Sequence, residues 1–469
     1  MDDQRSPDNS PPPAHPQISR RALLRAAGAS VIGVAGAAVL YEVLAHTSPM
    51  PHRVLPPRGG YPLGQYQIAD YGMPVIDDPA TAIQINIPPQ WNVVVTTTLT
   101  HTPTRADQQR LSAALAAVES AYAWSPTGVF TSVGYGLPYF RACVPASIVT
   151  AYLPRMIDTD APVLLDAIRF SGDPATTVLE ANDVVFHLRS DSLANLRDVQ
   201  RALFEQSGKL AGQPAPHADL GGLFRVTSVR TGFVGAGLPR RMASQAGLPY
   251  ASAIPASAPL FMGFTSTQTL GQAREETVRF DGRPDPNLSP LTTAHPGDYF
   301  AGGTALHVSH LYEDLAPWYQ LAYDQRATRM FQPNVPTTEG RVTIQTSWLN
   351  PNPSQPDAQD GHLLGHNEAV QRGSRTPEGQ ALQLRVDFNT MDAMDGPAGP
   401  GLHFLAFTPG SQIFHDSRKA MDATDITRRY AIASVANGIN SFIHATRRQN
   451  FLVPPRAHRS FPLLEFALP

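Results

Sequence analysis

Trp91–Leu99, with the sequence WNVVVTTTL, is the stretch that decides the fold, because a β-branched run of this length is typical of a strand. Leu111, Leu115 and Val118 follow at helical spacing within Thr104–Tyr122, which predicts an amphipathic helix. A strand followed by a helix that can cover it is how a layered α+β unit begins.

Four further segments complete this unit. We predict strands and a helix, in chain order, at Thr131–Gly136 (strand), Val184–Leu188 (strand), Leu193–Ser207 (helix) and Leu223–Val229 (strand). The resulting order, β-α-β-β-α-β, is the ferredoxin-like plan.

The second half of the chain carries a similar set of elements with longer insertions. The predicted elements are Thr304–His310 (strand), Leu315–Met330 (helix), Leu382–Asp387 (strand), Gly401–Phe407 (strand) and Ser411–Met421 (helix). We therefore predict an α+β protein with a duplicated ferredoxin-like fold of the dimeric α+β barrel type, with antiparallel sheets and peripheral helices. Its two sheets should face each other, with a pocket between or beside them.

Composition excludes several classes of protein. Hydrophobic residues make up 42% of the 469 residues and charged residues 16%, as in an ordinary globular chain. The net charge is -3 and no long basic run is present, so nucleic acid is not an expected partner. Cys143 is the only cysteine, so no intramolecular disulfide can form.

The N-terminus reads as a twin-arginine export signal over residues 1–45. Arg20 and Arg21 precede the weakly apolar stretch Ala26–Leu40, and paired arginines before a short apolar region suggest the translocase that carries folded cargo. Cleavage is left open because Leu44-Ala45-His46 is a poor site, and an uncleaved segment would anchor the protein to the membrane. The alternative is a basic-flanked helix that serves only as an anchor.

Domain boundaries follow from this segment. Residues 46–88 are rich in Pro and Gly and read as a linker or wrapped arm, so the body should begin near residue 88 without any contribution from residues 1–45. The two ferredoxin-like halves are placed at 89–260 and 261–469. Export predicts an extracytoplasmic location, either secreted, periplasmic or associated with the cell envelope. Export after folding also favours a bound prosthetic group.

The usual catalytic motifs are missing. Among fifteen histidines, His362 and His366 are four apart, but flanking glycines argue against a helical zinc pair. The chain has no Gly-x-Ser-x-Gly elbow and no glycine loop that would cradle phosphate. Hydrolase and nucleotide-binding functions are therefore not predicted.

Four stretches, taken in order, resemble the dye-decolourising peroxidases, a family of haem enzymes with a duplicated ferredoxin-like fold. They are Ser132–Gly136, Ala301–Val308 running into the helix with Trp318, Gly365–Glu368 and Leu384–Asn389. The resemblance spans roughly residues 90–469. It implies a haem-dependent peroxidase that reduces hydrogen peroxide at the expense of an organic electron donor, with haem b as cofactor.

The resemblance also implies roles for particular residues. His366 resembles the proximal ligand of the haem iron, and Arg385 the distal arginine that stabilises charge on a bound peroxide. Asp387 and Asn389 alternate with Arg385 along a strand and are further distal candidates. From the residues alone, His366 could instead be a loop histidine without a metal, and Arg385 could simply pair with an acid.

One motif departs from the family. Its Gly-x-x-Asp-Gly motif should fall at Thr231–Gly237, where Gly235 replaces the Asp and Ala236 the second Gly. The acid that would relay a proton between the peroxide oxygens is therefore missing, and weakened activity is expected. Two alternatives stay open: a non-catalytic protein that binds or handles haem, and a protein that keeps the fold without the cofactor.

Overall fold

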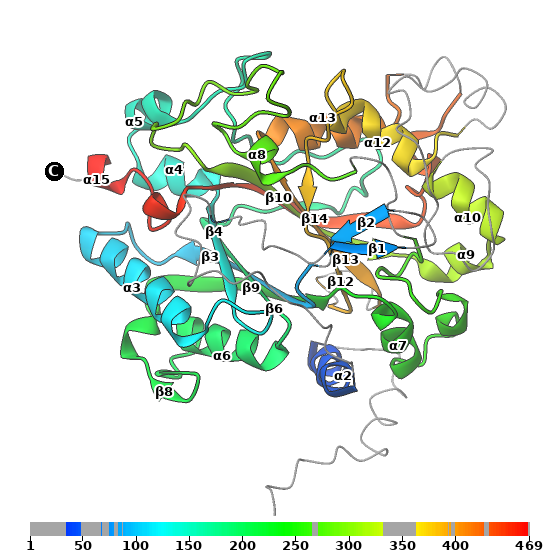
Figure 1. Ribbon diagram of the computed structural model, residues 1–469, viewed down its shortest axis with the longest axis horizontal. Helices are drawn as coiled ribbons and strands as arrows, with labels where there is room; N and C mark the ends of the chain where they lie inside the picture. The colour runs from blue at the N-terminus through cyan, green and yellow to red at the C-terminus, as the bar shows by residue number, and fades with distance from the viewer. Residues whose placement is uncertain are drawn as a thin grey trace, which may run out of the picture.

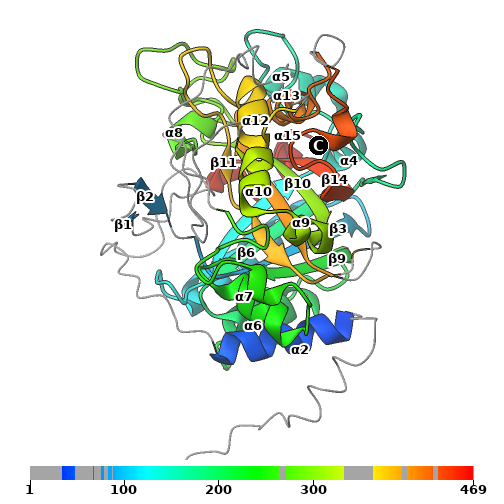
Figure 2. The ribbon, with the colours of Figure 1, turned by 90° about the vertical axis from the view of Figure 1, so that its right-hand side faces the viewer.

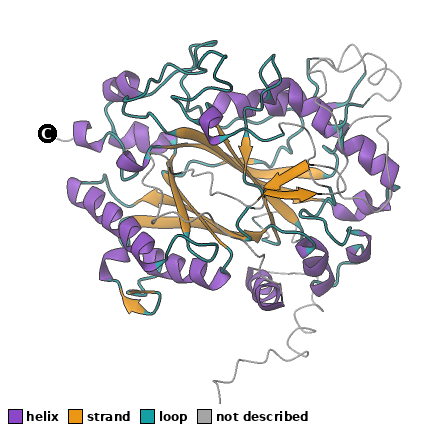
Figure 3. Cartoon of the chain, in the orientation of Figure 1, coloured by secondary structure: helices purple, strands orange, loops and turns teal. Residues whose placement is uncertain are grey.

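The computed structural model describes residues 34–47, 67, 75–78, 83–86, 88–264, 271–331, 363–392, 394, 399–425 and 431–467. Strands occupy the centre of the molecule and helices surround them (Figures 1 and 3). Among the predicted positions, Arg20, Arg21 and His362 lie outside the described residues.

The first half has the predicted order of elements. They are β3 (Trp91–Leu99), α3 (Arg105–Ala121), β4 (Phe130–Tyr135), β6 (Val184–Ser190), α6 (Leu193–Phe204) and β9 (Phe224–Phe233). Its strands lie in the order β9-β3-β6-β4, and all three pairings are antiparallel. This is the ferredoxin-like arrangement that the sequence predicts.

The second half repeats this arrangement. Its elements are β10 (Thr304–Glu313), α9 (Leu315–Gln320), α10 (Tyr323–Met330), α12 (His366–Ser374), β11 (Leu384–Arg385), β12 (Phe388–Thr390), β13 (Gly401–Thr408), α13 (Ser411–Met421) and β14 (Ile443–Val453). The strands lie in the order β14-β10-β13-β12, and β11 pairs with β13 as well.

Smaller elements surround the two halves. The helices are α2 (Val34–Thr47), α4 (Leu137–Cys143), α5 (Ala146–Tyr152), α7 (Leu238–Gln245), α8 (Glu275–Val278) and α15 (Leu464–Ala467). The strands are β1 (Val75–Asp78), β2 (Ile83–Asn86), β5 (Val178–Leu179), β7 (Lys209–Leu210) and β8 (Gln213–Pro214). Short 3₁₀ turns lie at Pro216–Ala218, Ala251–Ala253, Ser434–Ala436 and Arg456–His458.

The two halves are joined at both edges of their sheets. Tyr135 of β4 pairs with Leu452 of β14, and Phe233 of β9 pairs with Asn389 of β12, so the sheet closes on itself. The last strand of each half, β9 or β14, thus pairs with a strand of the other half, β12 or β4. The fold class is the predicted one, a duplicated ferredoxin-like α+β fold, and the facing halves are also hydrogen-bonded into one closed sheet.

Alternation along the strands gives the sheet two apolar faces. Val93 and Val95 of β3 belong to the large core cluster that also contains Leu111 of α3 and Leu196 of α6, so this face lies under the helices. Val94 belongs to a second cluster, which contains residues from distant strands and fills the interior of the closed sheet: Leu306, Val308, Phe388, Leu405, Phe407 and Phe451. The helices therefore cover the outside.

Two predicted elements of the second half are interrupted. The helix predicted over Leu315–Met330 is in fact α9 and α10, because Ala322 is extended and its backbone N–H donates to the side chain of Gln325. The strand predicted over Leu382–Asp387 pairs only at β11. Beyond β11 the N–H of Val386 still donates to the carbonyl of Leu405 (2.9 Å), and the carboxylate of Asp387 then accepts from Leu405 N (3.2 Å) in place of a carbonyl of the ladder.

The prediction that residues 1–45 lie outside the body is wrong for residues 34–45. These residues belong to α2, which lies along α6 and α7 (Figure 2). Its buried side chains belong to the large core cluster: Ala37, Leu40, Tyr41 and Leu44. None of the described helices is long and apolar enough to cross a membrane.

Candidate functional site

His366 is the first residue of α12, and backbone contacts fix its position. The N–H of Leu364 donates to Asn437 Oδ1 (2.7 Å), and the N–H of Ala369 donates to the carbonyl of Gly365 (2.8 Å). Gly438 packs against this turn with φ +52, and a Cβ there would lie 2.9 Å from the backbone nitrogen of His366. The start of α12 therefore depends on the absence of a side chain at position 438.

His366 is a neutral imidazole with an unused nitrogen. Burial lowers its pKa to about 3, and the positive charges of Arg385 and Arg418 lower it further. Its Nδ1 is buried and has no hydrogen-bond partner among the described residues. A neutral imidazole with a free nitrogen is the form that binds a metal.

Arg385 lies at the end of β11, across from α12. Its backbone N–H donates to Gln272 Oε1 (2.9 Å), and its Nη2 lies 3.4 Å from the carbonyl oxygen of Gly271. Its guanidinium is one of the charges that lower the pKa of His366, so the structure brings these two predicted residues together.

Arg385 and Asp387 project from the same face of their strand. The alternate residues Leu384, Val386 and Phe388 pack into the interior cluster, so positions 385 and 387 face outward, toward the helices. Burial raises the pKa of Asp387 to about 7, although the charge of Arg385 lowers it. This carboxyl can therefore gain or lose a proton near neutral pH.

Asn389 has a different environment. Its amide is buried, donates to the carbonyls of Phe233 (3.0 Å) and Pro259 (2.9 Å), and accepts from the N–H of Phe261 (2.9 Å). These bonds hold the seam between β9 and β12. All of these partners are backbone groups, so the geometry gives no support to the predicted role of Asn389 as a distal residue of a haem site.

Gly235 occupies the position of the missing acid. Its φ is +155, a conformation that L side chains rarely adopt, and a Cβ would lie 3.0 Å from Leu238 Cδ1. The loop is therefore built around glycine, and an acid would be strained in the present backbone.

A small cavity separates α12 from β11. It has a volume of about 30 Å³ and is lined by residues of both elements and of the neighbouring loops: Gly271, Asn367, Val370, Ser374, Arg375, Ala381, Gln383 and Arg385. Pockets for drug-sized ligands have volumes of about 300–1,000 Å³. Helix α12 packs closely against α13, because a Cβ at Gly373 would lie 2.3 Å from the backbone of Asp416.

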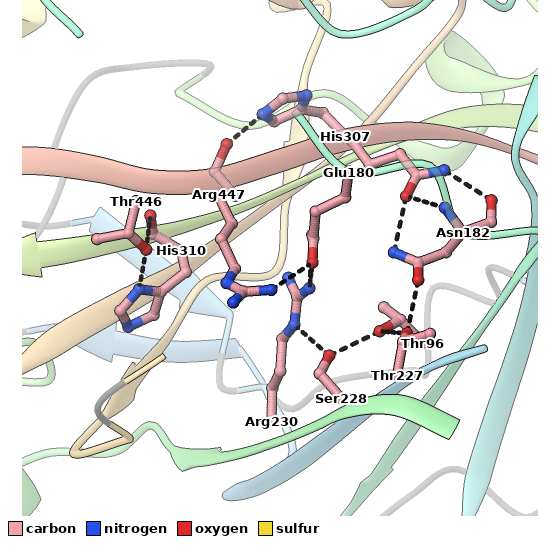
Figure 4. Close-up of polar contacts among 12 residues, drawn as sticks. Thr96, Glu180, Asn182, Thr227, Ser228, Arg230, His307, His310, Thr446 and Arg447 are labelled. Atoms are coloured by element: carbon pink, nitrogen blue, oxygen red, sulfur yellow. Dashed lines mark hydrogen bonds and ion pairs between the residues drawn. The ribbon is translucent and has the colours of Figure 1, made fainter. Parts of the chain in front are cut away.

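A polar cluster inside the closed sheet was not predicted from the sequence. Arg230 of β9 is completely buried, and its Nη2 donates to both carboxylate oxygens of Glu180, at 2.6 Å each (Figure 4). Arg447 of β14 contacts the same carboxylate at 3.4 Å, and Ser228 accepts from Arg230 Nε (3.0 Å). The cluster thus joins strands of the two halves through one shared carboxylate.

Buried histidines adjoin this cluster. His310 Nδ1 lies 2.6 Å from Thr446 Oγ1 (Figure 4), and its ring centroid lies 4.9 Å from that of His403. Burial lowers the pKa of both far below the usual value, so both are neutral. Among the described residues, no group of three or more His, Cys, Asp or Glu side chains could hold a metal ion. The alternation of side chains along β9 and β10 is the sequence signal that could have placed Arg230 and His310 inside the sheet.

Solved structures with a similar fold are dye-decolourising peroxidases. The encapsulated DyP-type peroxidase from Mycobacterium smegmatis has a TM-score of 0.50 and 13% identity over 82% of this chain and 98% of its own. A variant of DypB from Rhodococcus jostii RHA1 in complex with heme has a TM-score of 0.49 and 14% identity, with coverage of 80% and 96%. At such identities the likeness shows the fold alone. A search of curated proteins finds no match.

Sequence comparison gives a family without an assigned function. A family model described as "Family of unknown function (DUF7405)" matches residues 89–455, which include both ferredoxin-like halves, His366 and Arg385. Because the match covers more than half of the chain, this protein is a member of the DUF7405 family.

Proposed function

We propose that this protein is a haem-dependent, peroxidase-like oxidoreductase that reduces hydrogen peroxide with electrons from an organic donor. The observation that carries the proposal is the position of the buried, unbonded Nδ1 of His366 within the electrostatic field of Arg385. On a fold shared with a dye-decolourising peroxidase, a neutral imidazole with a free, buried nitrogen lies within the electrostatic reach of a fixed guanidinium.

The imidazole of His366 is a suitable ligand for haem iron, but the cavity beside it is too small for a porphyrin. His366 would hold the iron, and Arg385 would lie beside it. The cavity of about 30 Å³ between α12 and β11, which His366 does not line, is far smaller than a porphyrin needs, so the residues around His366 and Arg385 would have to rearrange to admit haem. When bound, haem iron supplies the redox chemistry of peroxide cleavage.

The residues of the chain would control charge and protons. Arg385 would place a permanent positive charge near the peroxide and stabilise the negative charge that develops on it. Asp387, with a pKa of about 7, would take the proton from peroxide when ionised and return it to the leaving oxygen. Because Gly235 replaces the acid of the family motif, Asp387 is the acid that we assign to this task.

We also propose that the protein is exported by the twin-arginine translocase. The proposal rests on the paired residues Arg20 and Arg21, which precede an apolar stretch. Changing both to Lys keeps the positive charge and should still block translocation, and normal export of that variant would contradict the proposed route. An uncleaved signal would leave the protein attached to the membrane.

Binding of haem without turnover is the second candidate function. The glycine at position 235 and the small cavity favour it, because both reduce the means of activating peroxide. In that case the protein would store, transfer or sense haem outside the cytoplasm.

The reaction of the haem-loaded protein with hydrogen peroxide separates these two functions. Stopped-flow absorbance should show a rate that rises with pH through about 7, as Asp387 ionises, and Asp387→Asn should remove this inflection. Arg385→Leu should slow the reaction by about 10²-fold or more, as loss of a charge-stabilising donor does elsewhere. Arg283→Leu, at an arginine outside the site, is the control. Bound haem that does not react with peroxide at any pH would leave only the binding function.

A further inference from the structure

Helix α2 has a buried face and an exposed face, although its composition is almost entirely apolar. Leu44 is 0% exposed and Tyr41 is 2% exposed, whereas Val39 is 38% exposed. The buried positions 37, 40, 41 and 44 follow the spacing of one helical face. The body therefore contacts one side of the helix, and Val39 lies on the other side.

The hydroxyl of Tyr41 fixes α2 at the seam between the two halves. It accepts from Met391 N (2.7 Å), lies 3.1 Å from Thr390 Oγ1 and 3.2 Å from Asp392 Oδ1, and is also 3.1 Å from the carbonyl of Thr231 in β9. Burial, followed by the charge of Asp392, raises its pKa far above the usual value, so the phenol stays neutral. One side chain of α2 thus bonds to both halves where β9 meets β12.

Other contacts surround this hydroxyl. The ring of Tyr41 lies edge-on to Trp91 and Phe233, with centroids 6.2 and 6.3 Å away. Within the helix, Glu42 pairs with Arg197 of α6, and at its C-terminal end the carbonyl of Thr47 accepts from Arg241 of α7. Apolar contact, hydrogen bonds and ion pairs act together here, as in a packed element of a domain.

These contacts have a consequence for the export signal. A translocase or a membrane must reach the apolar residues of a signal, yet Leu40, Tyr41 and Leu44 are enclosed by the body. The same side chains cannot contact both at once. We propose that the folded body binds the apolar helix of its own N-terminal segment, and that docking excludes presentation of that helix to the translocase or membrane.

The docking itself is independent of export. The second part of the proposal, that docked α2 cannot contact the translocase or membrane, rests on the proposed export route. Neither the docking nor this second part depends on haem. Docking can therefore be tested on the purified full-length chain without a translocase and without haem.

Two substitutions test the docking. Leu44→Asp and Val39→Asp reduce the hydrophobicity of the segment by similar amounts, but only Leu44 lies on the buried face. Leu44→Asp should lower the melting temperature by about 3–5 °C, and Val39→Asp should leave it unchanged. Equal shifts for both variants, or no shift for either, would overturn the docking.

Tyr41→Phe tests the exclusion. It retains the ring and increases the apolarity of the helix, but it leaves Met391 N and Asp392 without their shared partner. The undocked fraction should rise about tenfold, which corresponds to about 1.4 kcal/mol, and sedimentation with phosphatidylglycerol–phosphatidylcholine vesicles should increase in parallel. A lower melting temperature without more vesicle binding would overturn the exclusion and leave the docking intact.

Discussion

The His366→Ala chain should lose affinity for haem by at least about 100-fold while it remains folded. The iron would lose its ligand, whereas the closed sheet packs through side chains that do not involve His366. Titration with hemin, followed by absorbance, measures the affinity, and thermal unfolding measures the fold.

Two other histidines serve as comparisons. His415 of α13 is buried in the same half, and burial lowers its pKa to about 4, so His415→Ala removes a similar imidazole from outside the proposed site. His415→Ala should bind haem normally. If haem is retained by His366→Ala and lost by His362→Ala, His362 is the ligand and the assignment to His366 is wrong.

Gly438→Ala should weaken haem binding by about 10–100-fold although every proposed ligand is still present. The new Cβ would lie 2.9 Å from the nitrogen of His366 and 3.1 Å from the carbonyl of Leu364, so the backbone at the start of α12 must shift. Moving the ligand has nearly the same consequence as deleting it, because metal affinity depends on its orientation.

Gly208→Ala is the matched control for this backbone effect. Gly208 has φ +63, close to the +52 of Gly438, but a Cβ there would meet nothing within 4 Å. Both variants carry the conformational cost of a side chain at positive φ, and only Gly438→Ala adds the collision. Equal haem affinity in the two variants would show that the position of His366 does not control binding.

Much of the fold could be predicted from the sequence because local signals agreed with the final packing. The strand and helix of the first half, Trp91–Leu99 and Arg105–Ala121, have strong β-branched and helical patterns. Strand β14 was missed because Arg447, Gln449 and other polar residues interrupt its apolar pattern. The side chains of Arg447 and Gln449 face the interior polar cluster, whose partners Glu180 and Asn182 come from a distant part of the chain.

The N-terminal helix shows a second limit of sequence patterns. Apolar composition leads to the prediction that Ala26–Leu40 is a transport element, but it cannot reveal a binding face on the body. That face is formed by Thr231 of β9 and by Thr390–Asp392, which meet only after the two halves close. Such long-range contacts are absent from any local pattern.

For the candidate site, the sequence could indicate residue types but not their surroundings. Arg385 and Asp387 lie on one outward face, as strand alternation predicts. The amide of Asn389 is directed to backbone groups of the seam, and the φ of Gly235 excludes a simple return to the family motif. The first fact depends on contacts across the β9–β12 seam, and the second on the local conformation of the loop, where Gly235 lies against Leu238.

The most direct test of the haem site is a titration of the full-length protein with hemin, followed by its absorption spectrum. We expect a Soret band that saturates at one equivalent and is absent from the His366→Ala chain at the same hemin concentration, with changed hydrogen exchange in α12, the helix that begins at His366. A spectrum that stays that of free hemin, with no saturation, would contradict the proposed haem site and with it both candidate functions.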